Sequence, residues 1–142
     1  MNKEVITKSI EETQKFAQEF AGKLKPGNII ALYGELGAGK TIFVQGLAKG
    51  LGFRGKVFSP TFIFMRPYKL EGKIKTLYHI DLYRLEDIKD LKNIGVEEFI
   101  SEKDAVSAIE WAEKIEHLLP KNVIKIKIER LSEQARKITY FL

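Results

Sequence analysis

A glycine-rich segment in the first half of the chain constrains the fold more than any other feature. Residues 34–41 read Gly-Glu-Leu-Gly-Ala-Gly-Lys-Thr, a full match to the phosphate-binding pattern G-x-x-x-x-G-K-[ST]. The apolar run 28–33 precedes this segment, and residues 42–48 follow it with a helix-like pattern. The motif requires a strand before it and a helix after it, and the flanking residues predict both. The segment therefore predicts a nucleoside triphosphate site in an α/β fold.

The residue types of this loop account for the chemistry expected of it. Glycines let the backbone approach phosphates without a Cβ in the way, and the exposed N–H groups bind anions at the positive end of the next helix. Lys40 is expected to reach the β- and γ-phosphates, and the Thr41 hydroxyl is expected to bind Mg²⁺. The candidate nucleotide contacts are Gly34, Glu35, Leu36, Gly37, Ala38, Gly39, Lys40 and Thr41.

Length and composition exclude several other classes of protein. The 142 residues predict one domain spanning 1–142. No apolar run approaches the roughly 20 residues of a membrane span, and the first residues lack the apolar stretch of a signal peptide. The absence of cysteine excludes disulfides and thiolate metal sites, and these features together favour a cytoplasmic protein without a membrane partner. The net charge of +5 permits nucleic-acid contact, but it is spread along the chain and does not predict such contact by itself.

Segments with helical and strand-like spacing alternate along the rest of the chain. A capping box at Ser9 and Glu12 predicts a helix that runs to Leu24, and a second helix is expected over 41–50. Further strands are expected at 57–58, 62–65, 74–80, 105–109, 122–130 and 136–141, with short helices at 86–92, 96–103 and 112–119. This order predicts a three-layer α/β sandwich of the P-loop NTPase type. Its central sheet is expected to be mixed and mainly parallel, with antiparallel additions.

Two carboxylates follow apolar strand segments and are candidates for binding a metal or orienting water. Asp81 follows Leu77-Tyr78-His79-Ile80, and Glu110 follows Val106-Ser107-Ala108-Ile109. Ligands of open α/β sheets gather at the carboxyl ends of strands, and nucleotide hydrolysis needs a carboxylate there. A strand-end carboxylate that only caps the next helix is the alternative for either residue.

Three further segments allow both a functional and a structural interpretation. Arg84 could contact a phosphate or form an ion pair with Asp81. Trp111 could stack on a base, dock a partner or belong to the core. The loop Ser59-Pro60-Thr61-Phe62 could sense the γ-phosphate as switch loops do, or form a simple turn.

These segments occur in one order that closely resembles the small bacterial TsaE family, formerly called YjeE. The matching segments are GELGAGKT at 34–41, SPTF at 59–62, HIDLYR at 79–84 and AIEW at 108–111. The resemblance covers essentially the whole chain, including the Glu-Glu-Thr helix start and the C-terminal hairpin. Glu35 stands where many relatives carry Asp, which we interpret as a tolerated change in the loop.

The resemblance implies an ATPase of tRNA threonylcarbamoyladenosine biosynthesis. Such proteins bind ATP and Mg²⁺ and hydrolyse ATP slowly until they join the TsaB–TsaD heterodimer, which modifies the adenosine next to the anticodon. The ATPase then permits repeated turnover. The sequence leaves open whether the chain contacts tRNA directly or only through the complex, and it leaves the oligomeric state open.

The resemblance also assigns roles to particular residues. Lys40, Glu110, Asp81 and Trp111 become catalytic candidates, and Thr41, Glu110 and Asp81 become metal-site candidates. Additional nucleotide contacts are implied at Ser9, Thr13, Thr61 and Arg136.

Two other functions remain open from the residues alone. A small-molecule P-loop kinase uses the same loop, although no arginine-rich lid segment follows the core here. A nucleotide-dependent switch that does not hydrolyse ATP is the other. Hydrolysis without an acceptor argues against the kinase, and no hydrolysis even with partners argues for the switch.

Overall fold

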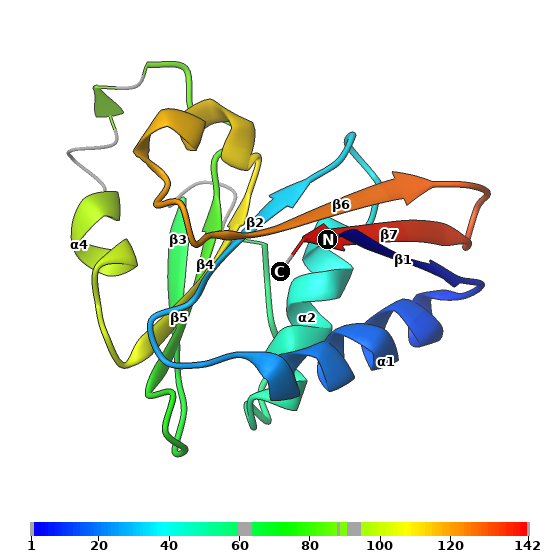
Figure 1. Cartoon of the computed structure of the whole chain (residues 1–142), viewed down its shortest axis with the longest axis horizontal. Coiled ribbons are helices and arrows are strands. Elements are labelled where there is room, and N and C mark those ends of the chain that lie inside the picture. The colour runs from blue at the N-terminus through cyan, green and yellow to red at the C-terminus, as the bar shows by residue number, and fades with distance from the viewer. Residues whose placement is uncertain (1, 60–63, 88, 91–94, 142) are drawn as a thin grey trace.

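A mixed seven-stranded sheet forms the centre of the molecule (Figure 1). The computed structural model describes residues 2–59, 64–87, 89–90 and 95–141. The strands are β1 (Asn2–Thr7), β2 (Ile29–Tyr33), β3 (Met65–Lys69), β4 (Thr76–Asp81), β5 (Ala105–Glu110), β6 (Ile124–Arg130) and β7 (Arg136–Phe141), in the spatial order β1-β7-β6-β2-β5-β4-β3. The four middle strands β6, β2, β5 and β4 are parallel, and antiparallel strands extend both edges.

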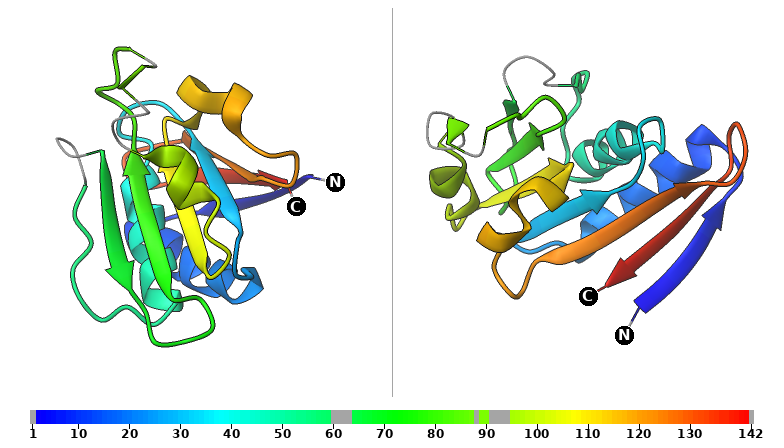
Figure 2. Two further views of the ribbon diagram at one scale, coloured as in Figure 1. Left: turned by 90° about the vertical axis from the view of Figure 1, so that its left-hand side faces the viewer. Right: turned by 90° about the horizontal axis from the view of Figure 1, so that it is seen from above.

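Helices cover both faces of this sheet (Figure 2). Helices α1 (Ile10–Phe20) and α2 (Lys40–Gly50), with the short 3₁₀ helix η1 (Ala21–Lys23), lie on one face. Helix α4 (Val96–Ile100) and the 3₁₀ helix η2 (Ala112–Leu118) lie on the other. The layers confirm the predicted three-layer α/β fold. No helix within the described ranges is long and apolar enough to span a membrane.

The burial of β2 explains why this strand lies in the middle of the sheet. Ile30 and Leu32 pack against α1 and α2, while Ile29 and Ala31 pack against the opposite layer. A strand covered on both faces must be apolar throughout, as parallel strands usually are. On β6, in contrast, only the alternate isoleucines are buried, so their register fixes which face meets the core.

The edges of the sheet differ from the sequence predictions in three places. Strand β1 was not predicted, and it pairs antiparallel with β7. Residues 57–58 form no strand. The strand expected at 62–65 begins at Met65 and runs to Lys69, while residues 62–63 lie outside the described part of the chain. Pro67 lies within β3, where an edge position tolerates its missing N–H group.

The helix predictions agree more closely with the structure. The Ser9 hydroxyl accepts a hydrogen bond from the Glu12 N–H at 3.1 Å, which confirms the predicted N-cap of α1. Helix α2 ends at Gly50, as predicted, and Gly52, with a φ of 97°, follows the helix end. The helix predicted at 112–119 is a 3₁₀ segment broken at Ile115. The helix expected at 86–92 falls partly outside the described residues.

Candidate nucleotide site

The glycine-rich loop joins β2 to α2, as the motif predicts. Gly37 and Gly39 have φ values of 81° and 105°, a region that residues with a Cβ rarely adopt. A Cβ on Gly34 would lie 2.6 Å from the carbonyl oxygen of Ile128, so β6 leaves no space there for a side chain. Two different constraints therefore require glycine in this loop: backbone conformation at two positions and close packing at the third.

A hollow of about 420 Å³, here called the loop hollow, lies beside this loop. Its walls come from the loop, from the first turn of α2, and from the residues at the ends of β4 and β5. Predicted site residues that line it include Lys40, Thr41, Asp81, Glu110, Trp111 and Arg136, together with Gly37 and Gly39. The fold thus brings together candidates that are far apart in the sequence.

A chain of hydrogen bonds connects the loop to the end of β5. The Thr41 hydroxyl lies 3.1 and 3.0 Å from the two carboxylate oxygens of Glu110 and donates to this group. Glu110 is 3% exposed, and its Oε2 lies 2.5 Å from Nε2 of the fully buried His79. Thr41, whose hydroxyl is expected to bind Mg²⁺, therefore directly contacts Glu110, one of the two candidate carboxylates.

The sequence analysis did not identify His79 as a site residue. A signal for it exists in the strand period, because residues two apart on a strand share a face and His79 precedes Asp81 by two. Its Nδ1 is buried and has no hydrogen-bond partner among the described residues. His79 thus makes its one ring hydrogen bond to Glu110 and holds that carboxylate in place.

Asp81 lies beside Glu110, since the two residues are paired in the β4–β5 register. Its carboxylate accepts hydrogen bonds from the Tyr83 N–H at 3.0 Å and from the Ser59 hydroxyl at 3.3 Å. Burial raises the pKa of Asp81, the neighbouring Glu110 charge raises it further, and the Tyr83 and Ser59 hydrogen bonds oppose this rise. Asp81 therefore retains a proton to a higher pH than an exposed aspartate does.

Lys40 is held inside the site, with 5% of its surface exposed. Its ammonium donates to the Gly34 carbonyl at 2.5 Å and lies 3.5 Å from the centre of the Trp111 ring, a cation–π contact. Burial lowers the pKa of Lys40, and the surrounding carboxylates, led by Glu110, oppose this effect.

Trp111 has a left-handed backbone with a φ of 59°, and the centre of its ring lies 5.1 Å from the centre of the Tyr83 ring. Its ring therefore contacts the site itself.

Arg136 contacts the loop from β7. Its Nε donates to the Ala38 carbonyl at 2.7 Å, and an Nη donates to the Gly37 carbonyl at 3.4 Å. The other Nη donates to carbonyls of residues 132, 133 and 135 in the turn before β7. Arg136 thus connects the last strand of the sheet to the backbone of the loop.

The other predicted contacts have different surroundings. Ser9 caps α1, and the buried Thr13 hydroxyl bonds Thr7 and the Ser9 carbonyl; neither residue lines the loop hollow. Their contact with a nucleotide stays a prediction. Thr61 lies outside the described residues. Arg84 is exposed and lines the hollow.

The donor atoms of this site suit Mg²⁺ bound together with a nucleotide. The described residues contain no group of three or more His, Cys, Asp or Glu side chains able to hold a metal by themselves. The loop hollow instead offers the Thr41 hydroxyl and the carboxylates of Glu110 and Asp81. Mg²⁺ usually takes one or two carboxylates and completes its coordination with phosphate oxygens and water. Thr41, Glu110 and Asp81 therefore fit the ion.

The fold and this site define a class: an α/β protein in which a glycine-rich loop joins a central parallel strand to a helix, with carboxylates at neighbouring strand ends. Within that class, residues 7–138 match the family model described as threonylcarbamoyl adenosine biosynthesis protein TsaE. The chain belongs to the TsaE family, and its role lies in tRNA threonylcarbamoyladenosine biosynthesis.

Individual relatives agree with this assignment. The tRNA threonylcarbamoyladenosine biosynthesis protein TsaE of Rickettsia bellii is 40% identical over 137 residues, which cover 96% of this chain and 92% of that one. The protein of the same name from Bacillus subtilis is 41% identical over 130 residues, covering 92% and 79%. The crystal structure of Bacillus subtilis YdiB superimposes with a TM-score of 0.81 at 35% identity, covering 99% of this chain and 84% of YdiB.

Proposed function

We propose that this protein binds ATP and Mg²⁺ at the loop 34–41 and hydrolyses ATP in the cytoplasm. It acts with the TsaB–TsaD heterodimer, and hydrolysis permits repeated rounds of tRNA modification. One observation carries the proposal: the Thr41 hydroxyl contacts both carboxylate oxygens of the buried Glu110 beside the loop. This juxtaposition provides the hydroxyl and the carboxylate that P-loop hydrolases use for Mg²⁺.

The surrounding residues support distinct steps of binding and hydrolysis. The backbone N–H groups of the loop and the N-terminus of α2 attract the phosphates. Lys40 exchanges its bond to the Gly34 carbonyl for a phosphate oxygen, and this exchange releases its ammonium from the Trp111 ring. Mg²⁺, when bound, neutralises charge on the phosphates.

The two strand-end carboxylates differ in their surroundings, which suggests different roles. Glu110 accepts hydrogen bonds from Thr41 and contacts His79, so its position is fixed on two sides. We assign Glu110 to the metal side of the site. Asp81 lies next to it with a raised pKa, and a more basic carboxylate is better suited to accept a proton from attacking water.

Two alternative functions lack a comparable observation. A small-molecule kinase needs a place for its acceptor beside the γ-phosphate, and no observation on the described residues indicates such a place. A switch that does not hydrolyse ATP would not need two buried carboxylates at the loop, because binding alone requires only the loop and the cation.

The proposal is tested by measuring phosphate release from ATP with purified protein, alone and with TsaB–TsaD, with Mg²⁺ or with EDTA. We expect slow release by the protein alone, strong stimulation by the partners, and no release in EDTA. ATP binding without hydrolysis in every mixture would contradict the proposal and favour the switch. Phosphate transfer to an added metabolite would favour the kinase.

A further inference from the structure

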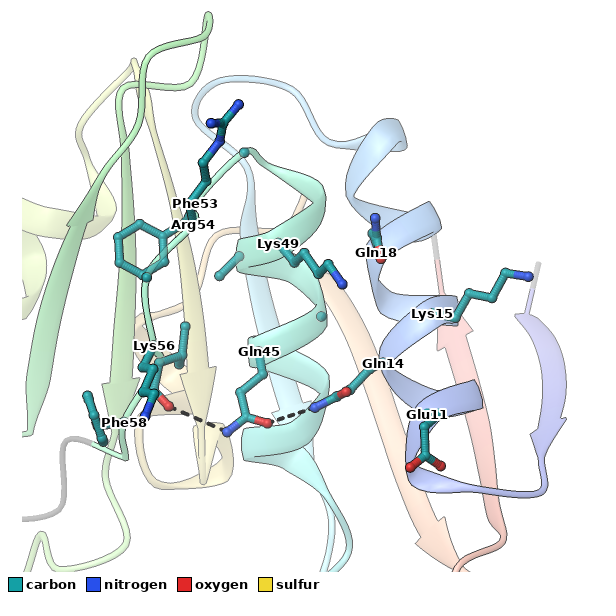
Figure 3. Close-up of a pocket in the computed structure, with 15 residues that line it drawn as sticks. Glu11, Gln14, Lys15, Gln18, Gln45, Lys49, Phe53, Arg54, Lys56 and Phe58 are labelled. Carbon is teal, nitrogen blue, oxygen red and sulfur yellow. Dashed lines mark hydrogen bonds between the residues drawn. The ribbon is translucent and has the colours of Figure 1, made fainter.

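A second and larger hollow, of about 1120 Å³, lies on the face of the molecule formed by α1, α2 and the segment 52–58 (Figure 3). We call it the basic groove. None of its lining residues is shared with the loop hollow. It is therefore a separate surface feature that the proposed ATPase chemistry does not use.

Positive charge dominates the basic groove. Lys15 on α1, Lys49 on α2, and Arg54 and Lys56 on the segment after α2 line it and are exposed. Within the described residues, none of these four side chains forms an ion pair with a carboxylate. Glu11 is the one acidic residue in the lining. Four cations from three elements thus line one hollow that contains a single acidic residue, an arrangement suited to an anionic ligand.

Hydrogen bonds hold the walls of the groove together. Gln14 Nε2 donates to Gln45 Oε1 at 2.9 Å, and Gln45 Nε2 donates to the Val57 carbonyl at 3.4 Å (Figure 3). These bonds connect α1 to α2 and α2 to the segment 52–58. The groove is therefore preorganised, and a ligand that enters it does not have to bring its walls together.

The end of α2 fixes the direction of the third wall. The N–H of Phe53 bonds the Ala48 carbonyl at 2.9 Å, and the N–H of Gly52 bonds the Lys49 carbonyl at 3.1 Å. This pattern is the Schellman motif, and Gly52 supplies the left-handed conformation that it needs. The chain then leaves α2 at a defined angle and places Arg54 and Lys56 in the lining of the groove.

Aromatic rings accompany the charges. Phe53 packs edge-on against Tyr68 with ring centres 4.7 Å apart, and the Tyr68 hydroxyl bonds the backbone of Phe58 at 3.1 and 3.3 Å. Tyr68 therefore anchors the segment at both of its ends. The Phe58 side chain itself is 57% exposed, although its backbone is held. An exposed ring on a fixed backbone beside lysines is the combination with which proteins stack bases and contact phosphates.

We infer that the basic groove binds the phosphodiester backbone of RNA, with Phe58 stacking on a base or ribose. RNA is favoured over an acidic protein segment because the groove pairs cations with an exposed ring and amide groups. The family also acts in a tRNA modification pathway. The inference rests on family membership and on the groove, and it does not depend on ATP hydrolysis.

The test compares two triple variants with the same change in charge. Lys15→Gln/Lys49→Gln/Lys56→Gln removes three cations of the groove. Lys25→Gln/Lys103→Gln/Lys121→Gln removes three exposed lysines that do not line it. The probe is an unmodified tRNA transcript carrying a fluorophore, and anisotropy gives its Kd over a series of salt concentrations. ATP hydrolysis without RNA is measured for both variants, so that failure of the proposed ATPase is distinguished from failure of the groove.

We expect the groove variant to bind the transcript at least about tenfold more weakly at low salt. Its slope of log K against log salt should be smaller by about 2 to 3, because each phosphate contact contributes about 0.7 to 0.9. The control variant should retain most of the affinity, and ATP hydrolysis without RNA should be unchanged in both. Phe58→Ala should weaken binding while leaving the salt slope unchanged, because it removes stacking and no charge.

Three results would overturn the inference. One is that the wild-type protein does not bind the transcript. Another is that both triple variants lose affinity and slope equally, which would indicate nonspecific attraction by net charge. The third is that the groove variant binds RNA normally and loses affinity for TsaB–TsaD instead, which would make the groove a docking surface for an acidic protein.

Discussion

At the scale of single residues, the contact between Thr41 and Glu110 makes the sharpest prediction. Thr41→Ala should reduce ATP hydrolysis by on the order of 10²-fold, because it removes a hydroxyl proposed to hold the metal beside the phosphates. The loss in stability should be only about 1 kcal/mol, the usual contribution of one hydrogen bond. Phosphate release and urea unfolding measure the two effects.

Thr41→Ser is the matched control, since it retains the hydroxyl and removes only a methyl group. It should keep most of the activity. Glu110→Ala should also abolish hydrolysis and retain the fold. Normal hydrolysis by Glu110→Ala in the partner complex, with none by Asp81→Ala, would reverse the roles assigned to the two carboxylates.

Asp81 makes a prediction about pH. Its pKa is raised in the folded state, mainly by burial, so the folded protein holds this proton more tightly than the unfolded chain does. Below the unfolded value of about 3.9, Asp81 is protonated in both states and has no charge to bury. As pH rises through the window between the two pKa values, unfolding releases a proton and the free energy of unfolding falls.

Asp81→Asn removes this charge and should therefore raise Tm at neutral pH, measured in EDTA. The gain should shrink as pH falls towards 4. The exposed Asp104→Asn is the control and should show little change of Tm at any of these pH values. A gain for Asp81→Asn that is independent of pH would mean that ionisation of Asp81 is not its cause.

At the scale of elements, close contact between α1 and α2 depends on glycines inside α2. A Cβ on Gly46 would lie 2.4 Å from the Gln14 carbonyl oxygen and 2.7 Å from the Ala17 methyl group. A Cβ on Gly50 would meet Gln18 and Ala21 in the same way. Both helices belong to the same core cluster, so neither can move freely to make space.

Gly46→Ala should therefore destabilise the protein by about 1–3 kcal/mol, the usual cost of overpacking. This cost exceeds the gain of about 1 kcal/mol that alanine brings to an unstrained helix. Gly22→Ala is the control: a Cβ there meets nothing within 4 Å, and its φ is not positive. That variant should be neutral or slightly more stable in urea unfolding. Equal stability of Gly46→Ala and the wild type would show that α1 moves away at little cost.

Elements with a clear local pattern were predictable, whereas the two edge strands, whose pattern is weak, were missed or misplaced. Strand β2, the loop and α2 follow one another in the chain, and their pattern predicted all three. Strand β1 is mostly exposed and contains two charged residues, and its partner β7 lies at the other end of the sequence, so its pattern carries little signal. Strand β3 was misplaced because Pro67 disguises an edge strand.

The candidate site shows the same division. Lys40 and Thr41 were predicted from the motif, and Asp81 and Glu110 from their places at strand ends. His79 was missed because a buried histidine on an apolar strand is more often part of the core. The contact of Arg136 with the loop was expected only through resemblance to a family, because it depends on how β7 closes the sheet.

At the scale of the whole molecule, the loop is held between two halves of the sheet. Strands β5 and β4 provide Glu110 and Asp81 on one side, and β7 provides Arg136 on the other. The Arg136 guanidinium donates to loop carbonyls and to carbonyls of the turn before β7, so it couples the C-terminal hairpin to the loop. The position of the loop N–H groups therefore depends on a strand that is distant in sequence.

Arg136→Gln should weaken ATP binding by about tenfold, equivalent to about 1.4 kcal/mol, because the loop loses a support that fixes its phosphate-binding geometry. Stability should fall by about 1.5–3 kcal/mol, since these hydrogen bonds come from a charged and buried group. ATP binding is measured by the fluorescence of Trp111, the one tryptophan of the chain, because its ring contacts Lys40 in the site. Arg130→Gln is the control, because Arg130 is exposed and bonds the same turn without reaching the loop. Equal loss of ATP binding in both variants would assign the effect to the hairpin and not to the bond between Arg136 and the loop.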